Sequence, residues 1–307
     1  MYLEPAPNAT LAKLCGNIKY RHTYLNLATY ESNFAPLRGR ALSIKPFLKW
    51  AGGKRWLVDR PEFVIPEYSG RYIEPFVGGG AVFFSHSPTS AIISDANARL
   101  IDTYRAIRNN WKSVVNELEK HQESHCRDYY YEVRSAKFED IHLRAAQFLY
   151  LNRACWNGLY RENLRGEFNV PIGTKSKIVM DDDNFELVST RLQNADILNE
   201  DFSVVISRAT EGDLVFVDPP YTVAHNFNGF VKYNQRIFSW NDQIRLRNSL
   251  FEAKIRGARI LLTNAAHDSI RQLYSYINNT PIEITRTSVI AGSSKNRVQT
   301  SELLYVF

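Results

Sequence analysis

The sequence has few cysteines and no long apolar run. Its three cysteines, Cys15, Cys126 and Cys155, are an odd number without a CxxC spacing, so neither a disulfide framework nor a cysteine zinc site is expected. No stretch approaches the roughly 18 apolar residues of a membrane helix. The first residues also lack the charged and then apolar segments of a secretory signal. We therefore expect a cytoplasmic protein with reduced thiols and no membrane partner.

Metal-binding patterns of histidine are missing as well. His121 and His125 stand at i and i+4 without the HExxH pattern, so we expect them on a solvated helix face. The acidic run Asp181, Asp182 and Asp183 is expected to form a solvated turn or a helix cap before Phe185. No metal site is therefore predicted.

Acidic residues are outnumbered by basic ones. The 307 residues include 38 Lys and Arg against 32 Asp and Glu, a formal net charge of +6, and 44% are hydrophobic. This composition is that of a soluble globular protein, and its charge suits a nucleic-acid partner without requiring one. Basic residues gather in residues 144–177, where the only acids are Glu162 and Glu167, and in the acid-free stretch 286–297.

Short apolar stretches alternate with helical ones through most of the chain. Strands are expected over residues 71–76, 91–94, 195–197, 213–217, 259–263 and 302–307, and helices from residues 54 and 81 and over 97–109 and 243–254. This alternation predicts an α/β fold, a doubly wound, mostly parallel sheet of the Rossmann-like kind with helices on both faces.

One part of the chain breaks this rhythm. Residues 106–184 contain helical segments at 111–120 and 141–153, followed by a basic loop rich in Gly and Asn. We expect an insert over 106–184, a core domain over 45–105 and 185–307, and an N-terminal extension of unknown role over 1–44.

The apolar strand expected at 213–217 ends in Asp218, Pro219, Pro220 and Tyr221. Ligands of open parallel sheets bind at the carboxyl ends of strands. The two prolines remove backbone donors and leave carbonyl oxygens as acceptors beside a carboxylate. The exocyclic amine of a flat base has two hydrogens. A carboxylate and a carbonyl can accept both of them while Tyr221 stacks on the ring of the base. The alternative is an ordinary turn stiffened by proline.

A glycine turn, Val77-Gly78-Gly79-Gly80, follows the strand expected at 71–76 and permits close approach of a ligand to the backbone. Dinucleotide-binding enzymes use similar turns, although the spacing here is not GxGxxG. Asp95, at the end of the next strand, is placed to accept both ribose hydroxyls of an adenosyl ligand. Residues 47–54, FLKWAGGK, add an aromatic ring, a flexible glycine pair and a cation. The alternative for this segment is a helix start with a snorkelling lysine.

Together and in this order, the KWAGGK segment, the glycine turn and the DPPY tetrapeptide resemble the Dam type of DNA adenine-N6 methyltransferases, the D12 class of the alpha group, from about residue 45 onward. The resemblance implies a site-specific enzyme that transfers a methyl group from S-adenosyl-L-methionine to adenine N6 in double-stranded DNA by base flipping. It assigns catalysis to Asp218, Pro219, Pro220 and Tyr221. It assigns cofactor binding to Trp50, Ala51, Gly52, Lys54, Phe76, Gly78, Asp95, Asp201 and Phe202.

Residues 149–171 resemble the DNA-recognition hairpin of the same family, which would make 106–184 the target recognition domain. The resemblance implies that Trp156 and Asn157 insert into the duplex. It also implies that base edges or nearby DNA groups are contacted by Lys49, Leu159, Arg161, Pro171 and Lys175. The alternative for Trp156 is a plain core aromatic.

One position departs from the family pattern. Thr174 stands where GATC-specific members carry arginine, and Lys175 follows it. Either a shift of the loop restores a cation or the target is a different short site, with GATC as the leading expectation. Solitary, restriction-modification and mobile-element settings remain open, so a cognate restriction endonuclease is one alternative partner of a monomeric enzyme.

Two other function classes also remain open. One is a methyltransferase for another planar amine, such as an RNA base or a glutamine side chain, and the other is a catalytically silent DNA-binding protein. The hairpin favours DNA over the first class, and the intact DPPY and cofactor segments disfavour the second.

Overall fold

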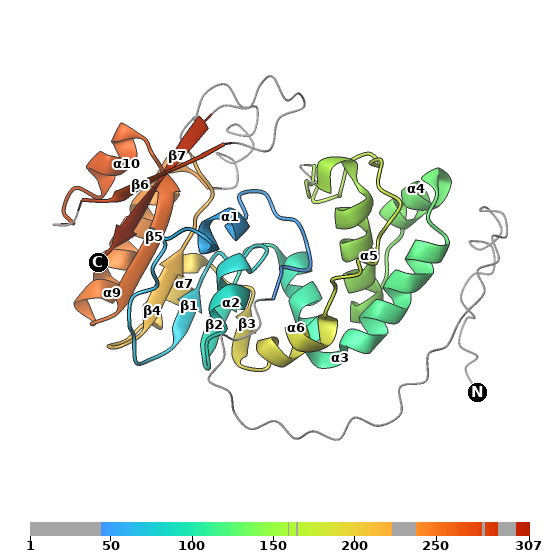
Figure 1. Cartoon of the computed structure of the whole chain (residues 1–307), viewed down its shortest axis with the longest axis horizontal. Coiled ribbons are helices and arrows are strands. Elements are labelled where there is room, and N and C mark those ends of the chain that lie inside the picture. The colour runs from blue at the N-terminus through green and yellow to red at the C-terminus, as the bar shows by residue number, and fades with distance from the viewer. Residues whose placement is uncertain (1–43, 159, 164, 223–237, 278–279, 288–298) are drawn as a thin grey trace.

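The computed structural model describes residues 44–307 except 159, 164, 223–237, 278–279 and 288–298 (Figure 1). The predicted extension 1–44 thus lies outside the described residues apart from Ile44, which is buried.

The described strands form one seven-stranded sheet in the order β3-β2-β1-β4-β5-β7-β6. The strands are β1 (Tyr72–Glu74), β2 (Ala91–Ser94), β3 (Ala195–Leu198), β4 (Leu214–Val217), β5 (Arg259–Ala265), β6 (Ile282–Thr287) and β7 (Gln299–Val306). The five strands β1 to β5 run parallel, whereas β7 pairs antiparallel with both β5 and β6. The predicted doubly wound, mostly parallel sheet is confirmed.

Helices cover both faces of the sheet. Successive side chains of each strand point to opposite faces, so apolar residues must be buried on both sides. Tyr72, Leu214 and Phe216 point into one core, which also contains side chains of α1 (Arg55–Val58), α2 (Ala81–His86) and α3 (Ala98–Glu123). Ile73 and Val215 point into the other core, with side chains of α7 (Phe202–Ser207), α9 (Trp240–Ile255) and α10 (Asp268–Leu273). Every residue of β4 is buried, as expected of a central parallel strand covered on both faces.

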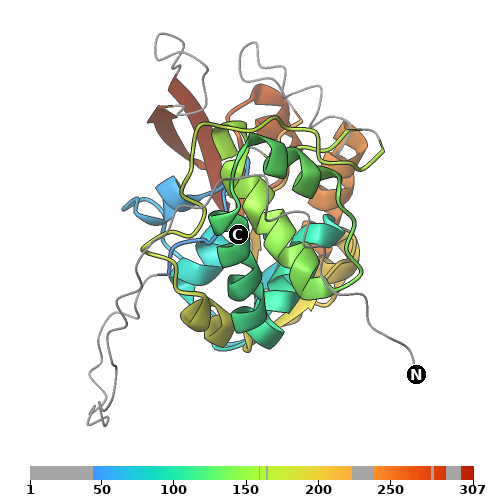
Figure 2. The same cartoon turned by 90° about the vertical axis from the view of Figure 1, so that its right-hand side faces the viewer.

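The helix α3 joins the sheet to the insert. It kinks at Asn110 and packs along α5 (Ile141–Ala154), and α4 (Arg127–Ser135) and α6 (Phe185–Leu192) also pack in this region. Figure 2 shows these helices in front of the sheet. The helices expected at 97–109 and 111–120 are two parts of α3, so the proposed domain boundary at 106 falls inside one helix that serves both regions.

The expectation that His121 and His125 lie on a solvated face was wrong. His121 is only 8% exposed, its Nδ1 lies 2.8 Å from the Tyr129 hydroxyl, and its ring stacks on Tyr150. His125 Nδ1 lies 2.8 Å from the Tyr150 hydroxyl. Burial lowers the pKa of His121 to about 4. The sequence around these histidines does not show that α4 and α5 pack over them. Tyrosine hydroxyls of these two helices form hydrogen bonds with the imidazoles, which makes their burial possible.

The prediction for the acidic run was wrong at Asp183. Asp181 and Asp182 are exposed and pair with lysines, but Asp183 accepts two hydrogen bonds from the buried Arg153 guanidinium, at 2.6 and 2.7 Å. The cap of α6 is Asn184, whose side chain accepts from the backbone of Leu187.

Candidate active site

The strands β1 and β4 are neighbours in the sheet although β2 and β3 lie between them in the chain. The order of strands therefore reverses between β1 and β4, and the carboxyl ends of these two strands form the position where open sheets bind ligands. The glycine turn follows β1 and the DPPY tetrapeptide follows β4, so the structure brings the two motifs to one place.

Within the part of the chain that the structure describes, the hydrogen bond and ion pair of Asp218 use one of its two carboxylate oxygens. Its Oδ1 lies 2.8 Å from Lys54 Nζ and accepts a hydrogen bond of 2.8 Å from Thr263 Oγ1. Neither contact uses Oδ2. Burial raises the pKa of Asp218, and the Lys54 ammonium opposes that rise. An amine placed beside this side chain would therefore meet a carboxylate whose Oδ1 is fixed by Lys54 and Thr263.

Lys54 is almost completely buried, with 4% of its side chain exposed. Its ammonium donates to the carbonyl of Gly52 at 3.0 Å and lies 3.4 Å from Glu302 Oε2 as well as beside Asp218. The same ammonium lies 4.9 Å from the ring centroid of Tyr221, whose hydroxyl donates to Glu302 Oε2 at 2.8 Å. Lys54 thus links the KWAGGK segment to the DPPY tetrapeptide.

Glu74, at the end of β1, is a third buried acid of this site. It accepts a hydrogen bond of 2.7 Å from the Tyr72 hydroxyl. Burial raises the pKa of Glu74 well above its usual range, and the neighbouring charge of Asp218 adds to the rise. Two of the acids, Asp218 and Glu302, pair with one lysine, and the third, Glu74, acts electrostatically on Asp218. A positively charged ligand would compensate part of the burial of such acids.

Sequence reasoning missed the roles of Glu74, Thr263 and Glu302. One signal was present in the sequence. Glu302 is a charged residue that directly precedes the apolar Leu303 and Leu304, within a stretch expected to be a strand. Their convergence depends on the sheet order, which brings β1, β4, β5 and β7 together from distant parts of the chain.

The glycine turn packs directly on the tryptophan of the KWAGGK segment. Gly78 has φ +46°, and a Cβ there would lie 2.6 Å from Trp50 Cδ1. The backbone N–H of Gly78 donates to Asp95 Oδ2 at 3.0 Å, and that of Asn97 donates to Asp95 Oδ1 at 2.9 Å. Asp95 therefore holds the glycine turn, a role that the sequence did not predict, and only its remaining lone pairs are available to a ribose.

Ala51 and Gly52 lie in the exposed turn that follows Trp50. This turn is closed by a hydrogen bond of 3.1 Å from the Gly53 N–H to the Trp50 carbonyl.

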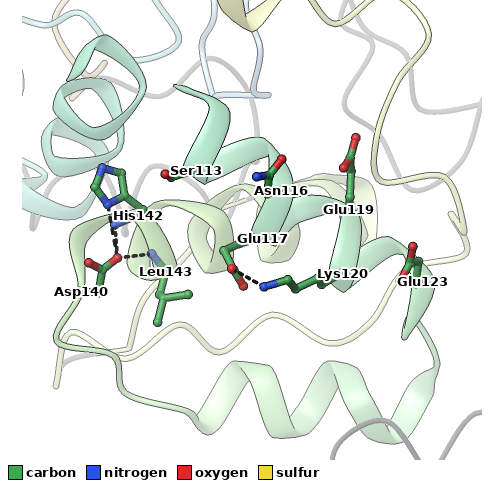
Figure 3. Close-up of a pocket in the computed structure, with 9 residues that line it drawn as sticks. All are labelled: Ser113, Asn116, Glu117, Glu119, Lys120, Glu123, Asp140, His142 and Leu143. Atoms are coloured by element: carbon green, nitrogen blue, oxygen red, sulfur yellow. Dashed lines mark hydrogen bonds and ion pairs between the residues drawn. The ribbon is translucent and has the colours of Figure 1, made fainter. Parts of the chain in front are cut away.

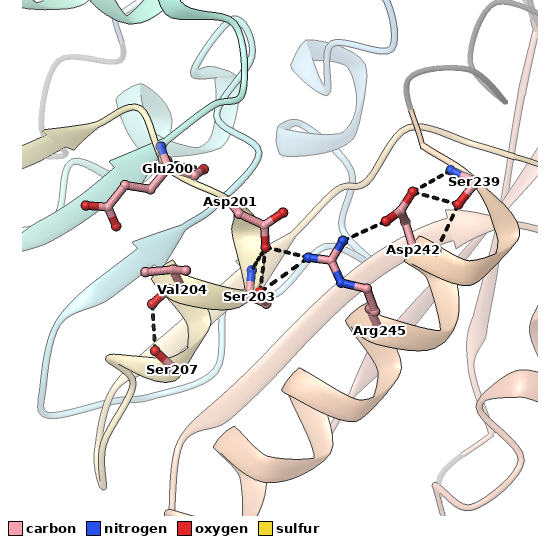
Figure 4. Close-up of polar contacts among 9 residues, drawn as sticks. Glu200, Asp201, Ser203, Val204, Ser207, Ser239, Asp242 and Arg245 are labelled. Carbon is pink, nitrogen blue, oxygen red and sulfur yellow. Dashed lines mark hydrogen bonds and ion pairs between the residues drawn. The ribbon is translucent and has the colours of Figure 1, made fainter.

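The aromatic residues assigned to the cofactor lie against each other. Phe76 and Phe202 stack with their centroids 5.3 Å apart, and the guanidinium of Arg245 lies 4.7 Å from the Phe202 centroid. Asp201 caps α7 and accepts a hydrogen bond of 2.6 Å from Arg245 (Figure 4). The structure thus brings Asp201, Phe202 and Phe76 together, and a flat ring can enter between the two phenyl groups only after they separate.

The residues assigned to DNA are exposed, unlike those assigned to catalysis. The exposed residues of this group are Lys49, Trp156, Asn157, Arg161, Pro171 and Lys175. Leu159 lies outside the described residues. Trp156 is 54% exposed, so the alternative of a core aromatic is wrong. Bridges between Cys155 and Ile172 and between Glu162 and Phe168 give the segment its hairpin form.

Two lysines lie close together beside the hairpin. Burial lowers the pKa of Lys49, and the neighbouring Lys175 ammonium lowers it further. Lys49 also packs on the hairpin itself, because a Cβ on Gly158 would lie 2.5 Å from Lys49 Cδ. Two adjacent cations on an exposed surface suit an anionic ligand such as DNA.

Buried side chains of α5 connect the hairpin to the KWAGGK segment. Asn152 accepts from the backbone N–H of Lys49 at 3.0 Å and donates to its carbonyl at 2.8 Å. Arg153 donates to the carbonyl of Phe47 at 2.6 Å. These two residues belong to the stretch that resembles a DNA-recognition hairpin, but in the structure they orient the segment that carries Lys54.

A pocket on the insert side of the described structure lies away from these residues. It has a volume of about 600 Å³ and is lined by residues of α3 and of the start of α5, including Glu117, Glu123, Asp140 and His142 (Figure 3). None of the residues assigned to the site lines this pocket.

No three His, Cys, Asp or Glu side chains in the described part of the chain form a group suited to a metal ion. Within the same residues, no helix is both long and apolar enough to span a membrane.

Comparison with known proteins identifies relatives over most of the chain. Residues 50–288 match the model of the D12 class of N6 adenine-specific DNA methyltransferases. The chain is 35% identical over 272 residues to the Type II methyltransferase M1.LlaDCHI of Lactococcus lactis subsp. cremoris, covering 85% of this chain and 95% of the relative. It is 36% identical over 260 residues to the Type II methyltransferase M.MjaIII of Methanocaldococcus jannaschii, covering 77% and 90%. Identity to the DNA adenine methylase of Escherichia coli K12 is 32% over 267 residues, covering 85% and 95%.

Proposed function

Because the chain belongs to the D12 class of N6 adenine-specific DNA methyltransferases, we propose that its methyl donor is S-adenosylmethionine and its substrate an adenine in a short site of double-stranded DNA, GATC or a related sequence. The observation that carries this proposal is the Asp218 carboxylate. One of its oxygens is held by Lys54 and Thr263, and the other is free of both contacts.

The proposed catalytic step is an orientation of the adenine amino group. Asp218 accepts one amino hydrogen and the carbonyl of Pro219 accepts the other, while Pro220 keeps the turn rigid and Tyr221 stacks on the base. The nitrogen is thereby turned toward the methyl group that it receives. No covalent enzyme intermediate is needed, so catalysis consists of orientation and electrostatics.

The proposed cofactor residues surround the glycine turn. S-adenosylmethionine supplies a methyl group already activated on a sulfonium, and its positive charge fits the buried acids Asp218 and Glu302 beside Lys54 and the neighbouring Glu74. Phe76 and Phe202 offer aromatic faces for its adenine, and Asp201 a carboxylate. Trp50, Ala51, Gly52, Gly78 and Asp95 shape the turn against which the remainder would bind.

The proposed recognition domain comprises residues 106–184, and the helix α3, which kinks at Asn110, leads into it. Moving an adenine from the duplex into the pocket costs a few kcal/mol of unstacking. Insertion of the exposed Trp156 and Asn157 and contacts of Lys49 and Lys175 with DNA would offset that cost. Arg161 and Pro171 lie exposed on the same hairpin and are proposed to touch base edges.

The proposed biological setting follows from the relatives. Their names include both Type II methyltransferases and DNA adenine methylases. We propose a monomeric enzyme that acts either beside a cognate restriction endonuclease or alone.

The direct test is Asp218→Ala in a tritiated methyl-transfer assay. We expect methylation to be lost while binding of S-adenosylmethionine and of DNA persists, because this side chain orients the amine. Asp182→Ala is the matched control, since Asp182 is an exposed acid far along the chain from the DPPY tetrapeptide. Undiminished activity of Asp218→Ala would refute the proposed catalytic role.

Long-read sequencing tests the substrate. DNA from a methylation-free host that expresses this chain is expected to contain N6-methyladenine in one recurring short context. Methylated RNA in the same host together with unmodified DNA would contradict the proposed DNA substrate.

A further inference from the structure

Glu302 is a charged residue in the interior of the sheet. It lies on β7 opposite Ala265 of β5, and only 3% of it is exposed. A carboxylate at such a position is stable only with polar or charged partners. Its Oε2 accepts the hydrogen bond of the Tyr221 hydroxyl at 2.8 Å and lies 3.4 Å from Lys54 Nζ. The last strand of the fold therefore reaches the centre of the catalytic site.

We propose that Glu302 is a positioning residue for methyl transfer, which acts on the base through Tyr221 and on the amine through Lys54 and Asp218. The inference rests on the proposed roles of Asp218 and Tyr221. It adds a residue that belongs neither to the DPPY tetrapeptide nor to the KWAGGK segment.

The first effect of Glu302 is on the orientation of Tyr221. The hydroxyl of this tyrosine is anchored at Glu302, and Lys54 lies over its ring at 4.9 Å from the centroid. An anchored hydroxyl restricts tilting of the ring, and stacking requires a ring held in one plane. Removal of the anchor is expected to leave the ring mobile and the base less well oriented.

The second effect is on charge. Lys54 Nζ lies between the two carboxylates, at 2.8 Å from Asp218 and 3.4 Å from Glu302. Burial raises the pKa of Asp218, Lys54 lowers it and Glu302 raises it. Thr263 donates a hydrogen bond that lowers the pKa, and the buried Glu74 interacts with Asp218 electrostatically. Without the charge of Glu302, Lys54 attracts Asp218 alone and the carboxylate becomes a weaker acceptor for the amine.

Two substitutions separate these effects. Glu302→Gln keeps an oxygen that accepts from the Tyr221 hydroxyl but removes the charge, whereas Glu302→Ala removes both. Glu283→Gln is the control, because Glu283 lies on the adjoining strand β6 in an exposed pair with Arg271.

The experiment measures kcat, KM for DNA and the pH profile of kcat for the full chain with saturating S-adenosylmethionine. In Glu302→Gln we expect the acid limb of the profile to move to lower pH, because the pKa of Asp218 falls. In Glu302→Ala we expect kcat to fall about tenfold or more, the usual effect of losing a hydrogen bond to a charged group. Adding Tyr221→Phe to Glu302→Ala is expected to cost less than the two single losses combined, since both remove the same hydrogen bond.

Several outcomes would overturn the inference. A wild-type pH profile and kcat in both Glu302 variants would do so, as would full additivity with Tyr221→Phe. If Glu302→Ala does not fold, the nearly isosteric Glu302→Gln and its pH profile decide alone. A wild-type chain that does not methylate DNA would instead refute the proposed function.

Discussion

A buried ion pair between Arg153 and Asp183 holds the guanidinium that donates to the carbonyl of Phe47, just before the KWAGGK segment. Arg153 and Asp183 have side chains only 5% and 11% exposed, and two hydrogen bonds of 2.6 and 2.7 Å join them. Asp183 also accepts from the backbone of Met180 at 2.9 Å. In Asp183→Ala the buried guanidinium keeps the carbonyls of Phe47 and Ile178 as hydrogen-bond acceptors but loses its anionic partner. Breaking a buried pair from one side costs about 3–5 kcal/mol.

The neighbouring Asp182 provides a control of the same chemistry. It pairs with Lys45 at 2.8 Å, but both side chains are more than half exposed. Water and salt screen an exposed pair and its side chains lose entropy when they form it, so Asp182→Ala is expected to behave as the wild type. The two variants therefore differ in burial and not in the type of residue removed.

The measurement is urea unfolding followed by circular dichroism. With a urea dependence of about 3 kcal/mol per M, a loss of 3–5 kcal/mol lowers the midpoint by about 1–1.7 M. We also expect weaker binding of S-adenosylmethionine by Asp183→Ala, because Arg153 holds the carbonyl of Phe47 just before the KWAGGK segment. Midpoints of Asp183→Ala and Asp182→Ala that agree within about 0.3 M would refute this reasoning.

Three further results are expected. Gly78→Ala should raise the dissociation constant of S-adenosylmethionine in a fluorescence titration about tenfold or more, because the new Cβ would lie 2.6 Å from an indole. Gly166→Ala, also at positive φ but with open space around it, is the control, and equal affinities of the two variants would contradict the steric argument. Trp156→Ala should leave the melting temperature unchanged and weaken DNA binding about 5-fold to 150-fold, the range of a lost stacking contact. In the control Phe251→Ala, which removes another exposed aromatic, DNA binding should stay as in the wild type. The free energy of unfolding should decrease as the pH falls from 6.5 to about 4, by up to about 3 kcal/mol, because the unfolded chain protonates His121 in that window and the folded chain does not. Urea titrations across this range should show a flatter dependence in His121→Phe, and an unchanged slope would show that other groups cause it.

The α/β class and the motifs of the site follow from short-range features of the sequence. The mainly apolar stretches at 91–94 and 214–217 are strands as predicted, because a parallel strand buried on both faces is a nearly continuous apolar run. The glycine turn and the DPPY tetrapeptide each follow such a strand, so their place at the carboxyl edge of the sheet was also predictable. The exposure of Trp156, by contrast, was undecided, because the chain around it does not show which face is covered.

Only the tertiary structure decided which distant side chains share one environment. Glu302 is more than eighty residues from Tyr221 in the chain, yet the antiparallel β7 beside β5 brings the carboxylate to the tyrosine hydroxyl. The same reason explains the burial of His121 and Asp183, whose neighbours in sequence are polar and whose partners Tyr129 and Arg153 come from other elements. Local sequence determines strands, turns and their motifs because these depend on nearby residues. Ion pairs and hydrogen bonds inside the fold depend on strand order and helix packing, which arise from the whole chain.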